Sequence, residues 1–314
     1  MKSYWLPTLV LLASLAALGQ ETTRTEARRL DVNGNAIPAG GVSESKNQAG
    51  GRTVRTEYGV DASGQRIPLT SSEETKTESN GHTIVQRVVR HYDQNGTLTS
   101  TERIQSEEQK LGGGAIEKNT AVYRTDLNGN EMLDERAVSR TDGKTSTTSV
   151  EKRGIDGTLT LTERQTTTTE TTPVGSKSQS STFHRDNNGN LFEVVKEVRE
   201  TAKQGTQTVE KESKYVARGD GSFALQEQTV TRTTPNPDGT VAKRIEVYGE
   251  QVPGVTNDSG KPALKEIQTV QVRKAAGGAV VETTTSQQAN VTDNGRLTDP
   301  KVISETVLTK TTNQ

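Results

Sequence analysis

A turn motif returns along this chain at a nearly constant interval, and this regularity constrains the fold more than any other feature. In five of nine units the motif reads Asp-x-x-Gly, as in Asp93-Gln94-Asn95-Gly96, and each motif glycine follows the previous one by 28 to 39 residues. Asn-Gly and Asp-Gly adopt positive φ at little cost, which the type I′ turn of a two-residue hairpin requires. The motif glycines are Gly34, Gly64, Gly96, Gly129, Gly157, Gly189, Gly221, Gly260 and Gly295.

A second set of eight turns falls 14 to 18 residues after the first eight motif glycines, near the middle of each unit. The two sets divide residues 20–314 into eighteen segments that are rich in Thr and Val, as strands prefer. No apolar residues recur at helical spacing. The sequence therefore predicts an all-β protein: an antiparallel meander of about 18 long strands, two per repeat, in an extended twisted or curled sheet or a wide closed barrel. The last units, residues 222–314, are less regular.

The composition leaves little material for a core. Hydrophobic residues are 28% of the chain and aromatics 3%, against about 45–50% apolar residues, glycine included, in average domains. Disorder is the alternative, but it would not place turn residues at a regular interval. The apolar residues gather beside the motif turns, which predicts a narrow apolar stripe near one row of turns. If the motif turns hold two residues, Phe183 pairs with Val194 and shares a face with Phe192.

The N-terminus has the three parts of a secretory signal. Lys2 is followed by an apolar run from Leu6 to Leu18, and Ala17-Leu18-Gly19 provides small residues for cleavage. We expect residues 1–19 to be removed, leaving residues 20–314 as one hairpin-repeat domain without tryptophan. The chain has no Cys, which excludes disulfides and thiolate chemistry. Without Lys2 there are 38 basic and 40 acidic residues, so no basic field for nucleic acid exists.

One unit resembles a known family. His91-Tyr92-Asp93-Gln94-Asn95-Gly96-Thr97-Leu98 is similar to the Tyr-Asp repeat of RHS-type secreted proteins, whose pattern is aromatic-Asp-x-x-Gly-x-Leu. Other units have Leu30, Val60, Thr125 or Arg185 in the aromatic position, and the period here is longer. The resemblance is one of turn physics, and it implies no activity for this chain.

Three of the motif turns have oxygen-bearing side chains at the spacing of a calcium-binding loop. Asp31-Asn33-Asn35, Asp126-Asn128-Asn130 and Asp186-Asn188-Asn190 match the first three oxygen ligands of an EF-hand-type loop. The rest of that loop is missing, since Ala36, Glu131 and Leu191 replace its glycine and only Asp186 has an acid at position twelve, Glu197. An Asp that hydrogen-bonds to its own turn explains the pattern better. We expect no metal site and no cofactor.

No other group of residues predicts catalysis. The histidines His82, His91 and His184 lack the partners of a metal or nucleophile motif, and Glu107-Glu108 has no apolar neighbours that would raise a carboxyl pKa. Three glycosylation sequons begin at Asn95, Asn257 and Asn290. We expect no catalytic, cofactor or metal residues, and no enzyme.

The sequence favours a secreted, non-enzymatic structural or interaction protein of the periplasm, cell surface or extracellular space. It would meet an extracellular partner, or further copies of itself, through exposed strand edges. The alternative is an outer-membrane β-barrel, which an even number of strands permits. Residues 82–92 argue against a lipid-facing wall, because Arg87 lies on one face of that strand and Arg90 on the other. A membrane partner is therefore not expected.

Overall fold

The computed structural model describes residues 20–30, 36–47, 51–61, 63–125, 129–249, 262–275, 279–290 and 296–313. The predicted signal segment and Trp5 lie outside these residues, and the first strand begins at Gln20. Within the described residues, no helix is long and apolar enough to cross a membrane.

Antiparallel strands make up nearly all of the described chain, as the Thr- and Val-rich segments predict. There are eighteen long strands and one additional short strand, β18. This architecture confirms the predicted all-β meander. The strands are β1 (Gln20–Leu30), β2 (Ala36–Asn47), β3 (Arg52–Val60), β4 (Arg66–Ser79), β5 (His82–Tyr92), β6 (Leu98–Lys110), β7 (Ile116–Thr125), β8 (Glu131–Asp142), β9 (Thr145–Arg153), β10 (Leu159–Thr172), β11 (Gly175–Arg185), β12 (Leu191–Gln204), β13 (Gln207–Ala217), β14 (Phe223–Pro235), β15 (Val241–Gly249), β16 (Ala263–Lys274), β17 (Val280–Asn290), β18 (Arg296–Leu297) and β19 (Lys301–Asn313).

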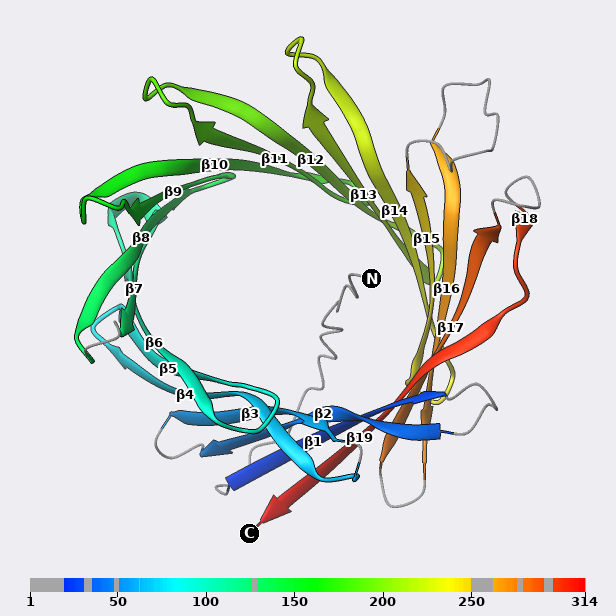
Figure 1. Ribbon diagram of the computed structural model, residues 1–314. Coiled ribbons are helices and arrows are strands. Elements are labelled where there is room, and N and C mark those ends of the chain that lie inside the picture. The colour runs from blue at the N-terminus through cyan, green and yellow to red at the C-terminus, as the bar shows by residue number, and fades with distance from the viewer. Residues whose placement is uncertain are drawn as a thin grey trace.

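The sheet closes on itself. β1 pairs with β2 on one side and with β19 on the other, from Gln20↔Asn313 to Arg28↔Glu305. Each remaining long strand pairs with its sequence neighbours, and the result is a closed barrel (Figure 1). Closure corrects the expectation that partners bind at strand edges, because every long strand is paired on both sides.

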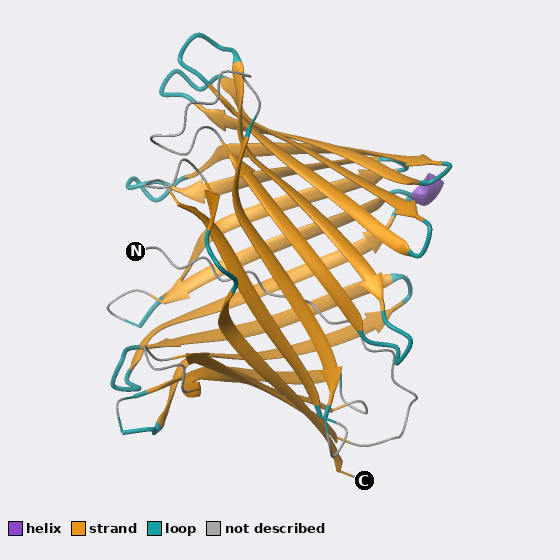
Figure 2. Ribbon diagram, turned by 90° about the vertical axis from the view of Figure 1, so that its right-hand side faces the viewer, coloured by secondary structure: helices purple, strands orange, loops and turns teal. Residues whose placement is uncertain are grey.

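The two sets of turns lie at opposite ends of the barrel. We call the end that carries the motif glycines the motif-turn end and the other the short-turn end, where the single-turn helix Gly112–Gly114 lies (Figure 2). At the short-turn end, Asn80 (φ 51°) and Gly81 (φ 80°) form the two-residue turn with two positive φ values that the sequence predicts.

The motif turns differ from the prediction. In the turn at Gly189 the Gly189 N–H donates to the Asp186 carbonyl at 3.0 Å and the Asp186 N–H to the Asn190 carbonyl at 2.8 Å. Only the glycine has positive φ (89°). These are type I turns followed by a left-handed glycine, a geometry that needs one positive φ rather than two.

Every hairpin at the motif-turn end also carries a β-bulge. The nine bulges occur in the pairs β1–β2, β3–β4, β5–β6, β7–β8, β9–β10, β11–β12, β13–β14, β15–β16 and β17–β19, and the other long-strand pairs have none. The turn sets the register up to the bulge, so that Phe183 pairs with Glu193 rather than Val194, and Phe192 pairs with His184 on the opposite face. Beyond the bulge, Thr182 pairs with Val195, which is the register that a two-residue turn would give. A bulge adds local twist and bends its strand, and nine at one level help to curl the sheet closed.

The short turns provide a test of backbone strain. A Cβ at Gly81 or at Gly112 would meet nothing within 4 Å, but only Gly81 has positive φ. We expect Gly81→Ala to lower the free energy of unfolding by about 1–2 kcal/mol because of left-handed strain, and Gly112→Ala to leave it nearly unchanged. Urea denaturation would measure both, and equal effects would contradict the turn geometry described here.

Candidate functional site

Backbone geometry decides which side chains enter the hollow of the barrel. Lys203 N–H donates to the Val174 carbonyl at 2.9 Å, so Ser176, two residues along β11, also bonds to β12. Consider a strand of L-residues viewed with its C-terminal end up. A residue whose side chain points toward the viewer then has its own N–H and C=O groups on the right-hand side of the strand. From inside the barrel, with the motif-turn end up, β12 lies to the right of β11 (Figure 1). Ser176 therefore points into the lumen.

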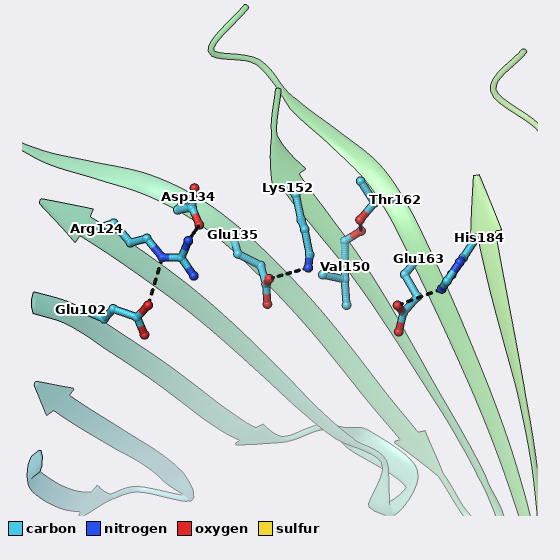
Figure 3. A network of polar contacts seen from close by, with 9 residues as sticks. All are labelled: Glu102, Arg124, Asp134, Glu135, Val150, Lys152, Thr162, Glu163 and His184. Atoms are coloured by element: carbon cyan, nitrogen blue, oxygen red, sulfur yellow. Dashed lines mark hydrogen bonds and ion pairs between the residues drawn. The ribbon is translucent and has the colours of Figure 1, made fainter. Parts of the chain in front are cut away.

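Directly paired residues lie on the same face of the sheet. The strand register therefore extends the assignment from β11 to the other strands of the barrel. On β11 the lumen side chains alternate from Ser176 to His184, and His184 pairs with Glu163 of β10. Figure 3 shows this wall with lumen residues from β6 to β11, including Glu102, Arg124 and Lys152. Arg87 also faces the lumen, and Arg90 faces outward.

The lumen is polar and its charges are balanced. Its described side chains include fourteen acids (Glu44, Glu57, Glu74, Glu78, Glu102, Glu108, Glu135, Glu163, Glu197, Glu210, Glu212, Glu227, Glu266 and Glu282) and fourteen bases (Lys46, Arg55, Lys76, Arg87, Lys110, Lys118, Arg124, Lys152, Arg199, Lys203, Lys214, Lys243, Lys274 and Lys301). Serine and threonine fill many of the positions between them. A water-filled lumen with this lining presents no strong net field to either sign of ion.

Ion pairs link neighbouring strands across the lumen wall. The Arg124 guanidinium lies 3.0 Å from Glu102 and 3.3 Å from Asp134, so that it joins β6, β7 and β8. Further along, Lys152 lies 3.4 Å from Glu135, and the imidazole of His184 lies 3.3 Å from Glu163 (Figure 3). Because these groups are half-exposed to solvent, each pair contributes about 0–1 kcal/mol. The pairs order the lining more than they stabilise it.

The outward face carries a ring of aromatic side chains at the level of the bulges. We call this the aromatic ring: Tyr58, Tyr92, Tyr123, Phe183, Tyr215 and Tyr248, on β3, β5, β7, β11, β13 and β15. Every tyrosine beyond residue 19 belongs to it. Their partners across the bulges include Pro68, Leu98, Leu133, Leu225 and Leu264. The predicted apolar stripe near one row of turns is confirmed, and it lies on the outside of the barrel.

Polar groups accompany the aromatic ring. The Arg103 guanidinium lies 4.0 Å from the centroid of the Tyr123 ring and that of Arg66 lies 4.9 Å from Tyr58. The Tyr248 hydroxyl donates to the Glu246 carboxylate at 3.1 Å. An apolar body with a polar tip is the arrangement that Tyr adopts where a surface meets both apolar and aqueous surroundings.

The outer wall is charged between the aromatic ring and the short-turn end. Ion pairs bridge outward side chains of neighbouring strands, as in Arg52–Glu73 at 2.9 Å, Lys177–Glu200 at 2.9 Å and Arg136–Glu151 at 2.6 Å. The outward bases are Arg24, Arg52, Arg90, Arg103, Arg136, Arg140, Arg164, Lys177, Lys196, Lys211, Arg232, Arg244 and Arg273. An outward Arg or Lys at the midplane of a bilayer costs about 2–4 kcal/mol. This wall differs from the apolar band of a lipid-spanning barrel.

The turn aspartates bind their own backbone. The Asp186 carboxylate accepts hydrogen bonds from the backbone N–H groups of Asn188 at 2.9 Å and Asn190 at 2.8 Å. This is the Asp that hydrogen-bonds to its own turn, as the sequence predicts. The turns of Asp31 and Asp126 lie largely outside the described residues. Within the described chain, no three His, Asp or Glu side chains gather as a metal site would require.

The other residues that the sequence singled out are dispersed. His82 pairs outward with Glu107 at 3.4 Å, whereas Glu108 faces the lumen with His91 and His184. Of the sequons, Asn95 lies in a motif turn and Asn290 ends β17, and Asn257 is outside the described residues. The aromatic ring as a single structure was not predicted, although a constant spacing signals it: Tyr58, Tyr123, Phe183 and Tyr215 each precede a motif glycine by six residues.

Comparison with known structures identifies the architecture. Searches against protein-family models and curated proteins return no match. A crystal structure of Pseudomonas aeruginosa OpdK with vanillate is similar with a TM-score of 0.54 and 10% identity, covering 93% of this chain and 98% of that one. A second structure of the same protein, OccK1 (OpdK), gives 0.52 at 10% identity, with 94% and 98% covered. Acinetobacter baumannii OccAB4 gives 0.44 at 9% identity, with 94% and 97% covered. The chain shares its barrel fold with the OpdK structures.

This likeness overturns the leading functional expectation. The closed barrel that the chain shares with the OpdK structures is the architecture of the alternative that the sequence left open, an outer-membrane β-barrel, and not that of a sheet with free edges. The expectation of a free, secreted structural or adhesive protein is therefore wrong, as is the expectation that a membrane is not a partner. A place at the cell surface remains compatible, and free secretion does not. Residues 82–92 do place Arg90 on the outer wall, as their alternation predicts, and closure decides only that Arg87 is the one in the lumen.

The turn aspartates generate a pH prediction. The backbone N–H of Asn190 holds the pKa of Asp186 below its ordinary value of 3.8, and the Ser63 hydroxyl does the same for Asp61. A carboxylate with a lowered folded-state pKa stabilises the fold above pH of about 4, and that stability is lost as pH falls through the folded-state pKa. Asn keeps a hydrogen-bond acceptor but does not titrate. We therefore expect the Asp61→Asn, Asp186→Asn double variant to lose less of its thermal midpoint between pH 5 and pH 2 than the original protein does. Asp142→Asn at the opposite end is the control, and an equal change there would contradict the assignment.

Proposed function

We propose that the protein is an outer-membrane channel barrel whose lumen conducts water and small polar solutes. The observation that carries the proposal is closure of the sheet through the β1–β19 pairing, with charged side chains of both signs on its inner face. Eighteen long strands enclose a lumen too wide for side chains to fill, as in barrels of 16–18 strands. The fold shared with the OpdK structures supports the same function.

The lining indicates which solutes would pass. With fourteen bases and fourteen acids among its described side chains, the lumen offers hydrogen-bonding and ionic groups of both signs. Polar solutes can exchange hydration for these groups, and neither cations nor anions are favoured by net charge. We therefore infer weak ionic selectivity. That the chain is not an enzyme stays a prediction.

Planar-bilayer recordings test the channel. We expect the purified protein to give stepwise conductance with a cation-to-anion permeability ratio near one. Changing Lys118, Lys214 and Lys243 to Glu should raise that ratio several-fold, because these three side chains face the lumen and their replacement makes it acidic.

The matched control changes the outward residues Arg140, Arg164 and Lys211 to Glu, with the same change of net charge. Its selectivity should stay that of the original protein. Absence of conductance would contradict the proposed function, and an equal shift from both sets would contradict the assignment of faces.

A further inference from the structure

We infer that membrane acyl chains contact the barrel only at the aromatic ring, and that the outer wall between this ring and the short-turn end faces water and lipid headgroups. The inference rests on the proposed function, and it concerns how such a barrel sits in its membrane. A lipid-spanning barrel of the usual kind has an outward apolar band about 25 Å tall, with aromatic residues at both borders.

The aromatic ring is a single level of the wall. Its members occupy the same position relative to the bulge on six strands, and their cross-strand partners are mostly Pro and Leu. No second level of outward aromatic residues follows toward the short-turn end in the part of the chain that the structure describes. One border of aromatic side chains is therefore present without its counterpart.

The wall below the ring is mainly polar, with single aliphatic residues between the polar ones. On β11 the outward residues after Phe183 are Ser181, Gln179 and Lys177. On β5 the outward residues below Tyr92 begin with Arg90 and include the aliphatic Val88 and Ile84. Cross-strand ion pairs such as Arg232–Glu246 at 2.7 Å, with the Glu246 side chain only 12% exposed, hold these charges in place. Such a wall cannot replace an apolar band.

Lipid headgroups match the chemistry of this wall. Phosphate groups accept hydrogen bonds from Arg, Lys, Ser and Thr side chains, and the outward wall presents all four. Headgroups that curve around the barrel below the ring would keep acyl chains away from the charges while the lumen still connects the two aqueous sides. The tyrosines, with apolar bodies and polar tips, would mark the border between acyl chains and headgroups.

Tryptophan fluorescence tests this arrangement, since Trp5 is the only tryptophan in the sequence. On a Trp5→Phe background, Phe183→Trp probes the aromatic ring, Gln179→Trp the outer wall and Ser178→Trp the lumen, all on β11. The proteins are reconstituted in phosphatidylcholine vesicles with or without bromine on the acyl chains. We expect bromine to reduce the Phe183→Trp emission at least twofold and to leave the other two unchanged, while aqueous iodide quenches Gln179→Trp.

Conductance of the same preparations separates this inference from the proposed function. Equal bromine quenching of Phe183→Trp and Gln179→Trp, with conductance retained, would overturn the inference and leave the channel standing. An unquenched Phe183→Trp would overturn it as well. Loss of conductance in the Trp5→Phe parent, with quenching only at the ring, would support the lipid contact and reject the channel. A β-type far-ultraviolet spectrum for each variant confirms that the barrel has formed.

Discussion

The backbone hydrogen-bond ladder, closed through β1 and β19, is the interaction on which the rest of this structure depends. The described chain buries few apolar side chains, among them Tyr58, Ile267, Val270 and Val281, and no layer of helix or second sheet covers the strands. In such a chain an open edge would leave a row of unpaired N–H and C=O groups. Closure pairs that edge, and it also creates the lumen.

Bulges connect the hydrogen-bond ladder to the aromatic ring on the outer surface. Each of the nine motif hairpins has one extra residue at the same level, and two of the extra residues are threonines whose hydroxyls bond to the opposite strand. Thr99 donates to the His91 carbonyl at 3.0 Å. Thr162 donates to the Val150 carbonyl at 3.2 Å (Figure 3). The same level carries the aromatic ring, so one device curves the sheet and positions the tyrosines. Twist and surface chemistry are thus coupled in each repeat.

Polar side chains on both faces give this barrel its particular character. A strand with one apolar face commits that face to a core or to lipid, whereas here Thr, Ser and paired charges stand on the lumen side and on the outer side alike. The lumen can therefore hold water along its length. The outer wall, for the same reason, excludes acyl chains from most of its height and leaves the aromatic ring as the place where lipid contact is favourable.

The sequence by itself determined the strands, their number and the two rows of turns, because turn chemistry and β-propensity are local properties of residues such as Asn80-Gly81 and the Thr-rich run of β10. It also placed the aromatic residues near the motif turns. It did not predict the register at Phe183, because a two-residue turn and a type I turn followed by a left-handed glycine both suit an Asn-Gly pair, and the bulge appears only in the paired strands. Nor could it decide which side of a strand is inside. Arg87 and Arg90 differ by three residues on one strand, and only closure of β1 on β19, a pairing between residues almost three hundred positions apart, sends one into the lumen and the other to the outer wall.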